Sequence, residues 1–269
     1  MYESLELADT AVAVFLAPLQ ADSAQLSRIE SWLRADELER GSRFVTTELQ
    51  NRFKICRGML RWLLGQITDS APEQIQLEYG QWGKPGVKLS PLQSPIHFNV
   101  SHSLDWAMFA FARSPIGIDL EVWQERIKYR SIASQILAVE EQPVFDTLPA
   151  KEHAQTILEL WVCKESLLKA MGLGIAEGLK KTAFRLPIPS NEEFSPSRID
   201  PTLQLHIEDD ASCRMNHWTD AECWRTRLLN LDSIQSTANN SDPSLFAALT
   251  CMPHIDDIRL KTLECADLT

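Results

Sequence analysis

Two acidic residues share one predicted strand. The run GIDLEVW places Asp119 and Glu121 two residues apart among apolar residues. Successive side chains of a β-strand alternate between its faces, so the two carboxylates lie on one face and Ile118, Leu120 and Val122 on the other. Taken alone, the pattern favours an amphipathic strand with its acids in water, because surface carboxylates are common. The alternative is a pair of oxygen ligands for a cation.

A second charged group falls on a predicted helix. Residues 152–174 have the apolar periodicity of an amphipathic helix and end in a glycine-rich turn. Lys164, Glu165 and Lys169 lie within it. Alone, these three side chains predict an exposed charged face with some i,i+4 pairing.

Three further segments carry groups that can bind phosphate. FNVSHS ends a predicted strand with Ser101 and His102, a pair that alone is more often a turn with a surface histidine. The predicted helix 46–68 carries Lys54, Arg57 and Arg61 on one stripe. Lys84 lies in a glycine- and proline-containing turn.

Taken together, these groups suggest one site for a metal and a polyphosphate. Mg²⁺ prefers octahedral oxygen ligands and commonly takes one or two carboxylates plus substrate phosphates. Mn²⁺ accepts the same ligands. The acids that can hold the metal are Asp119, Glu121 and Glu165, and the groups that can neutralise phosphate oxygens are Lys54, Arg57, Lys84, His102, Lys164 and Lys169. Such a set stabilises displacement at phosphorus.

The composition narrows the class of protein. The chain has 269 residues, 44% hydrophobic and 23% charged, which is enough for one large domain or two smaller ones. The formal net charge of −11 argues against nucleic-acid binding. The six cysteines form no CxxC and are expected to be free thiols of a reducing compartment. The apolar run 11–19 is too short to span a bilayer and has no basic flank, so we expect a cytoplasmic protein without membrane attachment.

The elements that must position these residues mix helices and strands without a βαβ rhythm, which favours the α+β class. The predicted strands are 11–19, 75–87 with a turn inside it, 96–103, 105–114, 116–123, 204–210, 223–231 and 244–251. The predicted helices are 23–33 with Ser23 as N-cap, 46–68 beginning at Thr46, short pieces within 129–148, and 152–174. Residues 187–201 and 232–244 are predicted loops, and the last residues are expected to be an appended tail.

Four motifs occur in an order and spacing that resemble the Sfp-type 4′-phosphopantetheinyl transferases. They are GKP at 83–85, FNVSHS at 98–103, GIDLE at 117–121 and WVCKESLLKAMGLGI at 161–175. The resemblance covers residues 40–180 by motif. It implies a pseudo-dimeric fold of two similar α/β subdomains, 1–115 and 116–255, followed by a tail, 256–269. It also implies that coenzyme A is bound in the cleft between the halves.

The resemblance implies an activity and a role for each matching residue. The 4′-phosphopantetheine arm of coenzyme A passes to a serine of an acyl or peptidyl carrier protein, and adenosine 3′,5′-bisphosphate is released. Asp119, Glu121 and Glu165 match metal ligands. Glu165 also matches a base for the carrier serine, and Lys169 matches a lysine at the pyrophosphate. The remaining matches to coenzyme A contacts are Lys54, Lys84, Ser101 and His102, with Arg57 nearby.

Other interpretations stay open at this point. A different metal-dependent phosphotransferase acting on a nucleotide would need the same acids and cations but no carrier. A coenzyme A-binding scaffold without activity would have no reason to retain the complete set. For a carrier partner, the net charge of −11 makes whole-molecule attraction unhelpful, so we expect an apolar contact area, with local help from Arg40, Arg43 and Arg52 as the alternative. A chain that contains both halves is expected to act as a monomer.

Overall fold

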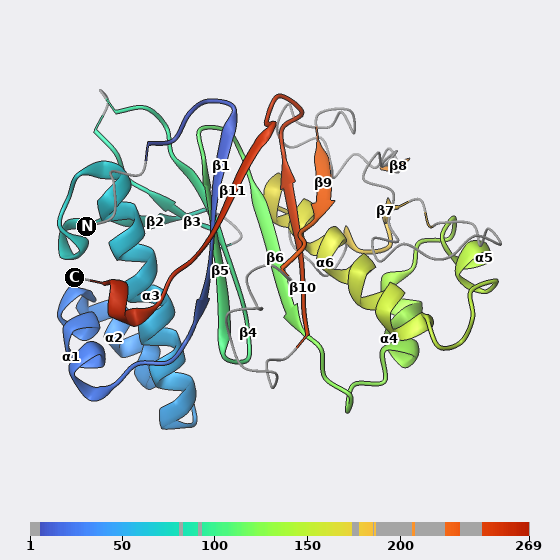
Figure 1. Cartoon of the computed structure of the whole chain (residues 1–269), viewed down its shortest axis with the longest axis horizontal. Helices are drawn as coiled ribbons and strands as arrows, with labels where there is room; N and C mark the ends of the chain where they lie inside the picture. Colours follow the sequence, from blue (N-terminus) through green and yellow to red (C-terminus); the bar gives the residue numbers. More distant parts are fainter. Residues whose placement is uncertain are drawn as a thin grey trace. The chain divides into compact units, whose positions relative to one another are not determined.

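Two compact units make up the computed structural model (Figure 1). The described residues are 6–80, 83–90, 93–173, 178–184, 186, 206–207, 224–231 and 244–268. One unit contains Met1–Arg113 and Asp257–Thr269, and the other contains Ser114–Asp256. Both mix helices with strands, so the predicted α+β class is confirmed.

The first unit is built on a four-stranded sheet in the order β11-β1-β5-β4. Its strands are β1 (Ala11–Pro18), β4 (His97–Ser103), β5 (Trp106–Ala112) and β11 (Asp257–Thr262). The pairs β1–β5 and β5–β4 are antiparallel, whereas β11 runs parallel to β1 from Ala11↔Asp257 to Leu16↔Thr262. A short hairpin of β2 (Leu77–Tyr79) and β3 (Pro85–Val87) accompanies the sheet.

The prediction of an appended C-terminal tail is wrong. β11 extends the sheet of the first unit, and Leu263, Cys265 and Leu268 behind it belong to the buried core. The segment DIRLKT alternates charged and apolar residues, which suits an edge strand with one exposed face. A strand of this kind has no apolar run that would mark it in the sequence.

Helices cover the sheet of the first unit. They are α1 (Ser23–Trp32), α2 (Ala35–Ser42), α3 (Thr47–Thr68) and the short 3-10 turn η1 (Pro72–Gln74). The apolar stripe of α3 and the inward side chains of the strands form one core, in which Met59 and Leu63 join Phe15 and Phe109. Burial of this stripe explains why the 3.6-residue periodicity predicted α3 correctly.

The N-termini of two helices test the predicted caps. Thr46 caps α3 as expected, because its hydroxyl accepts a hydrogen bond from the Leu49 amide at 3.2 Å. The prediction that Ser23 caps the first helix is wrong. Asp22 caps α1 and accepts from the Gln25 amide at 2.8 Å, and the Gln25 side chain accepts from the Asp22 amide at 2.8 Å. This reciprocal pair is a capping box.

The second unit is a three-stranded antiparallel sheet covered by a long helix. The sheet order is β6-β10-β9, with β6 (Gly117–Val122), β9 (Arg225–Leu228) and β10 (Leu245–Cys251). α6 (His153–Met171) packs on one face of it, and α4 (Tyr129–Ile136) packs on α6 (Figure 1). The remaining elements are α5 (Gln142–Phe145), and β7 (Thr182–Ala183) paired with β8 (His206–Ile207).

A glycine allows α6 to approach the sheet closely. A Cβ atom on Gly117 would lie 1.9 Å from the Ser166 carbonyl oxygen and 2.4 Å from the Ala170 nitrogen. The backbone of α6 therefore rests directly on the first residue of β6, two residues before Asp119. Just after this contact α6 stops at Gly172, whose φ of +71° is in the left-handed region that glycine tolerates.

Some predictions fall outside the described residues. This is so for the loop 187–201, for all but the last residue of the loop 232–244, and for all but His206–Ile207 of the predicted strand 204–210. The cysteines within the described ranges are free thiols, as expected. Among the described helices, none combines the length and the apolar character needed to cross a membrane.

Candidate functional site

Asp119 is buried, which the strand pattern alone did not favour. Its relative exposure is 1%, whereas Glu121 on the same face is half-buried. The cause is α6, which covers this face of β6. An acid that would be in water on an uncovered sheet is thereby enclosed, and an enclosed carboxylate requires compensation by positive charge or hydrogen bonds.

Lys169 supplies positive charge to two acids. Its Nζ donates to Asp119 Oδ1 at 2.5 Å and lies 3.5 Å from Glu165 Oε2. Glu165 and Lys169 are four residues apart on α6, so both face the same side of the helix. The structure thus brings together three residues that the sequence analysis selected. We call Asp119, Glu165 and Lys169 the acid–lysine cluster.

The protonation of Glu165 is shifted toward neutral pH. Burial is the largest cause, followed by the negative charge of Asp119, and together they raise the pKa of Glu165 to about 7. Lys169 opposes the shift, and Glu121 adds to it. A carboxyl group with such a pKa is suited to general acid–base chemistry, because both of its protonation states are populated near neutral pH.

The predicted metal ligands are not gathered into a closed metal site. Among the described residues, no three or more His, Cys, Asp and Glu side chains are grouped so that they could hold a metal ion. The cation between Asp119 and Glu165 in this structure is the ammonium group of Lys169. The donor chemistry nevertheless fits a hard cation, because all three predicted ligands are carboxylates.

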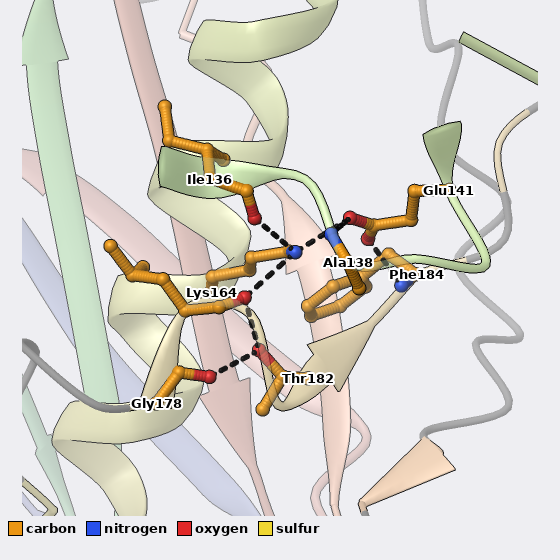
Figure 2. Close-up of polar contacts among 8 residues, drawn as sticks. Ile136, Ala138, Glu141, Lys164, Gly178, Thr182 and Phe184 are labelled. Atoms are coloured by element: carbon orange, nitrogen blue, oxygen red, sulfur yellow. Dashed lines mark hydrogen bonds and ion pairs between the residues drawn. The ribbon is translucent and has the colours of Figure 1, made fainter. Parts of the chain in front are cut away.

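Lys164 does not belong to this group, which corrects its predicted place on an exposed face among the phosphate-binding cations. Its side chain is fully buried, and its Nζ donates to Glu141 Oε2 at 2.6 Å, to the Ile136 carbonyl at 2.7 Å and to the Leu179 carbonyl at 2.9 Å (Figure 2). Successive residues of a helix point about 100° apart. Lys164 therefore faces a different part of the unit from Glu165.

The predicted coenzyme A contacts on α3 are engaged with carboxylates. Lys54 Nζ donates to Glu30 Oε1 at 2.7 Å, and Arg57 Nε lies 3.6 Å from Glu37 Oε1. Both cations are largely covered, with relative side-chain exposures of 19% and 11%. Binding of a phosphate at these two residues would have to compete with their present partners.

The other predicted contacts lie on β4 and beside it. Ser101 is buried and His102 is exposed, as expected for neighbours on one strand. Lys84 precedes β3 and is half-buried. Burial and the charge of Lys84 lower the pKa of His97, at the start of β4. His97 was missed in the sequence, since no motif marks it.

Glu141 was also missed, because nothing in the sequence indicates that a glutamate before a short helix is buried.

The predicted site residues are divided between the two units. The first unit contains Lys54, Arg57, Lys84, Ser101 and His102, and the second contains Asp119, Glu121, Glu165 and Lys169. A buried acid, a second carboxyl group with a pKa of about 7 and a lysine that contacts both are groups suited to general acid–base chemistry.

Comparison with known proteins specifies the class. A model described as 4′-phosphopantetheinyl transferase, N-terminal, matches residues 19–114, and one described as 4′-phosphopantetheinyl transferase superfamily matches 115–221. The 4′-phosphopantetheinyl transferase HetI of Nostoc sp. is 34% identical over 65% of this chain and 74% of its own. The 4′-phosphopantetheinyl transferase psf-1 of Bacillus pumilus is 28% identical over 72% of this chain and 87% of its own. The 4′-phosphopantetheinyl transferase Sfp of Bacillus subtilis is 27% identical over 59% of this chain and 69% of its own. The chain belongs to the 4′-phosphopantetheinyl transferase superfamily and is a transferase.

Proposed function

We propose that this chain transfers the 4′-phosphopantetheine arm of coenzyme A to a serine of an acyl or peptidyl carrier protein. Family membership supports the reaction type. The observation that carries the proposal is the acid–lysine cluster, in which Glu165 titrates near neutral pH beside Asp119 and Lys169. A nucleotide phosphotransferase without a carrier would use the same groups, but the family relationship favours a carrier.

The reaction exchanges one phosphorus–oxygen bond for another. The serine oxygen forms a bond to the phosphorus of the pantetheine phosphate, and the pyrophosphate bond breaks. The electron pair of that bond leaves with adenosine 3′,5′-bisphosphate. Glu165, in its ionised form, accepts the proton of the serine hydroxyl. Lys169 is assigned to the pyrophosphate oxygens, and binding there would have to compete with its present contacts to Asp119 and Glu165.

A divalent cation fits the second unit on chemical grounds. Asp119, Glu121 and Glu165 would hold Mg²⁺ or Mn²⁺, since both ions take oxygen ligands. The pKa of Glu165 is raised first by burial and then by the negative charge of Asp119, and a cation bound beside the carboxyl would favour its ionised form. When bound, the ion would supply charge neutralisation at the pyrophosphate.

Contacts to the nucleotide part of coenzyme A are proposed in the first unit. The exposed imidazole of His102 and the ammonium group of Lys84 suit phosphate oxygens. Ser101, Lys54 and Arg57 complete the proposed set. A related architecture in both units supports the pseudo-dimeric fold, because each unit packs one long helix, α3 or α6, on a β-sheet.

An apolar surface of the first unit suits the carrier. Phe44, Val45 and Leu49, at the junction of α2 and α3, have relative exposures of 39%, 94% and 39%. We call these three residues the junction patch. Nearby arginines are engaged within the chain: Arg43 binds Glu39 at 2.6 Å, and Arg52 binds Glu48 at 2.6 Å and also contacts Asp105. Arg40 is exposed and lies over the Phe53 ring at 5.7 Å from its centroid, so the junction patch offers apolar contact with one basic side chain near it.

Intact-mass measurement tests the proposed function. The protein is incubated with coenzyme A, Mg²⁺ and apo carriers from fatty-acid, polyketide and nonribosomal-peptide systems. At least one carrier is expected to gain the phosphopantetheine mass. Asp119→Ala should reduce the rate at least ~100-fold, because it removes a proposed metal ligand and a partner of Lys169. Asp146→Ala, at an exposed acid of the same unit, is the control.

Two results would contradict the proposal. No mass gain on any carrier, with nucleotide products formed instead, would favour the carrier-free phosphotransferase. Near-normal transfer by Asp119→Ala at saturating Mg²⁺ would contradict the metal assignment.

A further inference from the structure

The residue before Glu165 in the sequence, Lys164, forms a buried ion pair with Glu141. The relative side-chain exposures of Lys164 and Glu141 are 0% and 1%, and Lys164 Nζ is 2.6 Å from Glu141 Oε2. The ammonium group has three hydrogen-bonding partners, because Nζ also donates to the carbonyls of Ile136 and Leu179 (Figure 2). A lysine has three N–H donors, so its capacity is completely used within the protein.

Glu141 extends the pair to two more segments. Its Oε2 accepts the Ala138 amide at 2.7 Å, and its Oε1 accepts the Phe184 amide at 2.7 Å. The pair therefore connects α6 with the end of α4, with the turn before α5 and with the segment 179–184 (Figure 2). Thr182 continues this segment, since its hydroxyl donates to the Gly178 carbonyl at 3.2 Å.

The residue on the other side of Glu165 is fixed as well. The Ser166 hydroxyl donates to the Cys163 carbonyl at 2.8 Å and lies 2.8 Å from the Thr250 hydroxyl on β10. Thr250 in turn lies 2.7 Å from the Thr226 hydroxyl on β9. Residues 164 and 166 point in directions about 200° apart around the helix. α6 therefore cannot rotate without breaking one of these two sets of bonds.

Stability alone does not account for a buried ion pair. Replacing such a pair by apolar residues of similar size is often neutral or stabilising, because desolvation offsets the attraction between the charges. Burial disfavours the charged forms of both residues, since it raises the pKa of Glu141 and lowers the pKa of Lys164. What the pair does impose is geometry, because each charge must reach all of its partners.

We propose that Lys164 and Glu141 are positioning residues for the transfer reaction. They set the rotation of α6 so that Glu165 and Lys169 face Asp119, and Lys164 makes no contact with coenzyme A. This inference rests on the proposed function. It assigns a purely orienting role to a lysine whose place beside a catalytic glutamate would suggest phosphate binding.

Steady-state kinetics separate an orienting role from a binding role. In Lys164→Met, Glu141 keeps a buried charge without its partner, so kcat should fall ~10-fold or more while KM for coenzyme A stays within ~2-fold. Lys164→Met/Glu141→Gln removes both charges and should recover much of kcat, because the two residues act as a unit. Lys180→Met, at an exposed lysine of the same unit, is the control.

A direct contact with coenzyme A would give the opposite pattern. KM for coenzyme A would rise in Lys164→Met, Glu141→Gln would resemble the wild type, and the double variant would be no better than Lys164→Met. That result would overturn the inference. If Lys164→Met does not fold, Glu141→Gln carries the comparison, since Lys164 keeps both carbonyl acceptors in it. It should then lower kcat at unchanged KM, and a wild-type kcat would overturn the inference.

Amide hydrogen exchange tests, in the absence of substrate, whether the Lys164–Glu141 pair holds the surrounding segments in place. The backbone N–H groups of Ala138 and Phe184 donate to the Glu141 carboxylate. Both should exchange at least ~10-fold faster in Glu141→Gln or Lys164→Met than in the wild type, whereas the amides of α3 should keep their rates. Unchanged exchange at both amides would overturn the inference. Absence of transfer by the wild-type protein would instead overturn the proposed function, so the two failures are distinguishable.

Discussion

The titration of Glu165 couples the chemistry of the site to the stability of the protein. In the unfolded chain this carboxyl ionises near pH 4.5, and in the folded protein near pH 7. Between these values the folded state binds more protons than the unfolded state, so the free energy of unfolding falls as pH rises through this window and levels off above it. The shift corresponds to ~3 kcal/mol.

Urea unfolding of the metal-free protein from pH 5 to pH 8 tests this prediction. The wild type should lose up to ~3 kcal/mol over the window, whereas Glu165→Gln, which is neutral throughout, should lack that loss. Added Mg²⁺ should reduce the loss in the wild type by favouring the ionised carboxyl. Parallel profiles for the two proteins would contradict the shifted pKa.

Residue types and their spacing indicated one contact of the acid–lysine cluster, but not the burial of its members. Glu165 and Lys169 are four apart on a helix, so their contact could be expected from the sequence. Taken alone, the local patterns around Asp119 and Lys164 favoured exposure to solvent. Their burial depends on α6 covering β6 and on segments 136–141 and 179–184 covering α6. These packing partners are distant in the sequence, and no local pattern records them.

At the scale of elements, the close packing of α6 on β6 depends on one glycine. Gly117→Ala would place a methyl group 1.9 Å from the Ser166 carbonyl oxygen, so the helix must move. We expect a loss of ~3 kcal/mol or more in the free energy of unfolding, measured in urea. Transfer activity should fall too, because the displaced helix carries Glu165 and Lys169.

Gly86→Ala on β3 provides the matched control. A Cβ there meets nothing closer than 3.6 Å, and the backbone does not have a positive φ. Its unfolding free energy should change by less than ~1 kcal/mol. Similar losses for the two variants would show that close packing at Gly117 is not the cause.

Elements with strong periodicity were predicted well, and weakly patterned ones were missed. The stripes of α3 and α6 and the apolar runs of β1 and β5 are recognisable, because each buries one continuous face. α2, with the sequence ADELERGS, was missed, because Leu38 is the one large apolar residue in its eight positions. Its start is stabilised by the Glu37 side chain, which accepts the Arg34 amide at 3.0 Å.

At the scale of the whole molecule, the net charge of −11 makes whole-molecule attraction an unhelpful basis for binding a carrier, so local contacts should matter most. Val45→Asp places a negative charge in the centre of the junction patch. It should lower kcat/KM for the carrier ~10-fold or more while KM for coenzyme A is unchanged. Stability should be unaffected, because Val45 is 94% exposed.

Val139→Asp is the corresponding control in the second unit, where Val139 is 85% exposed. It should leave the transfer rate close to that of the wild type. Equal effects of the two substitutions would indicate non-specific repulsion of the carrier rather than contact at the junction patch.

The last residues of the chain are predicted to matter for stability, in contrast to an appended tail. Leu263 is completely buried in the core of the first unit, so Leu263→Ala should cost ~2–5 kcal/mol. Lys261→Ala, at an exposed position on β11, should change stability by less than ~0.5 kcal/mol. If neither substitution changed the free energy of unfolding in urea, this segment would add nothing to the stability of the core.

The position of β11 also has a consequence for biosynthesis. The ribosome makes β1, β4 and β5 first, then all of residues 114–256, and only afterwards the strand that completes the first sheet. At about 5–20 residues per second this interval lasts on the order of ten seconds. During that time the outer edge of β1 has exposed, unpaired backbone groups. We therefore expect the nascent first unit to complete its sheet only when its final strand emerges.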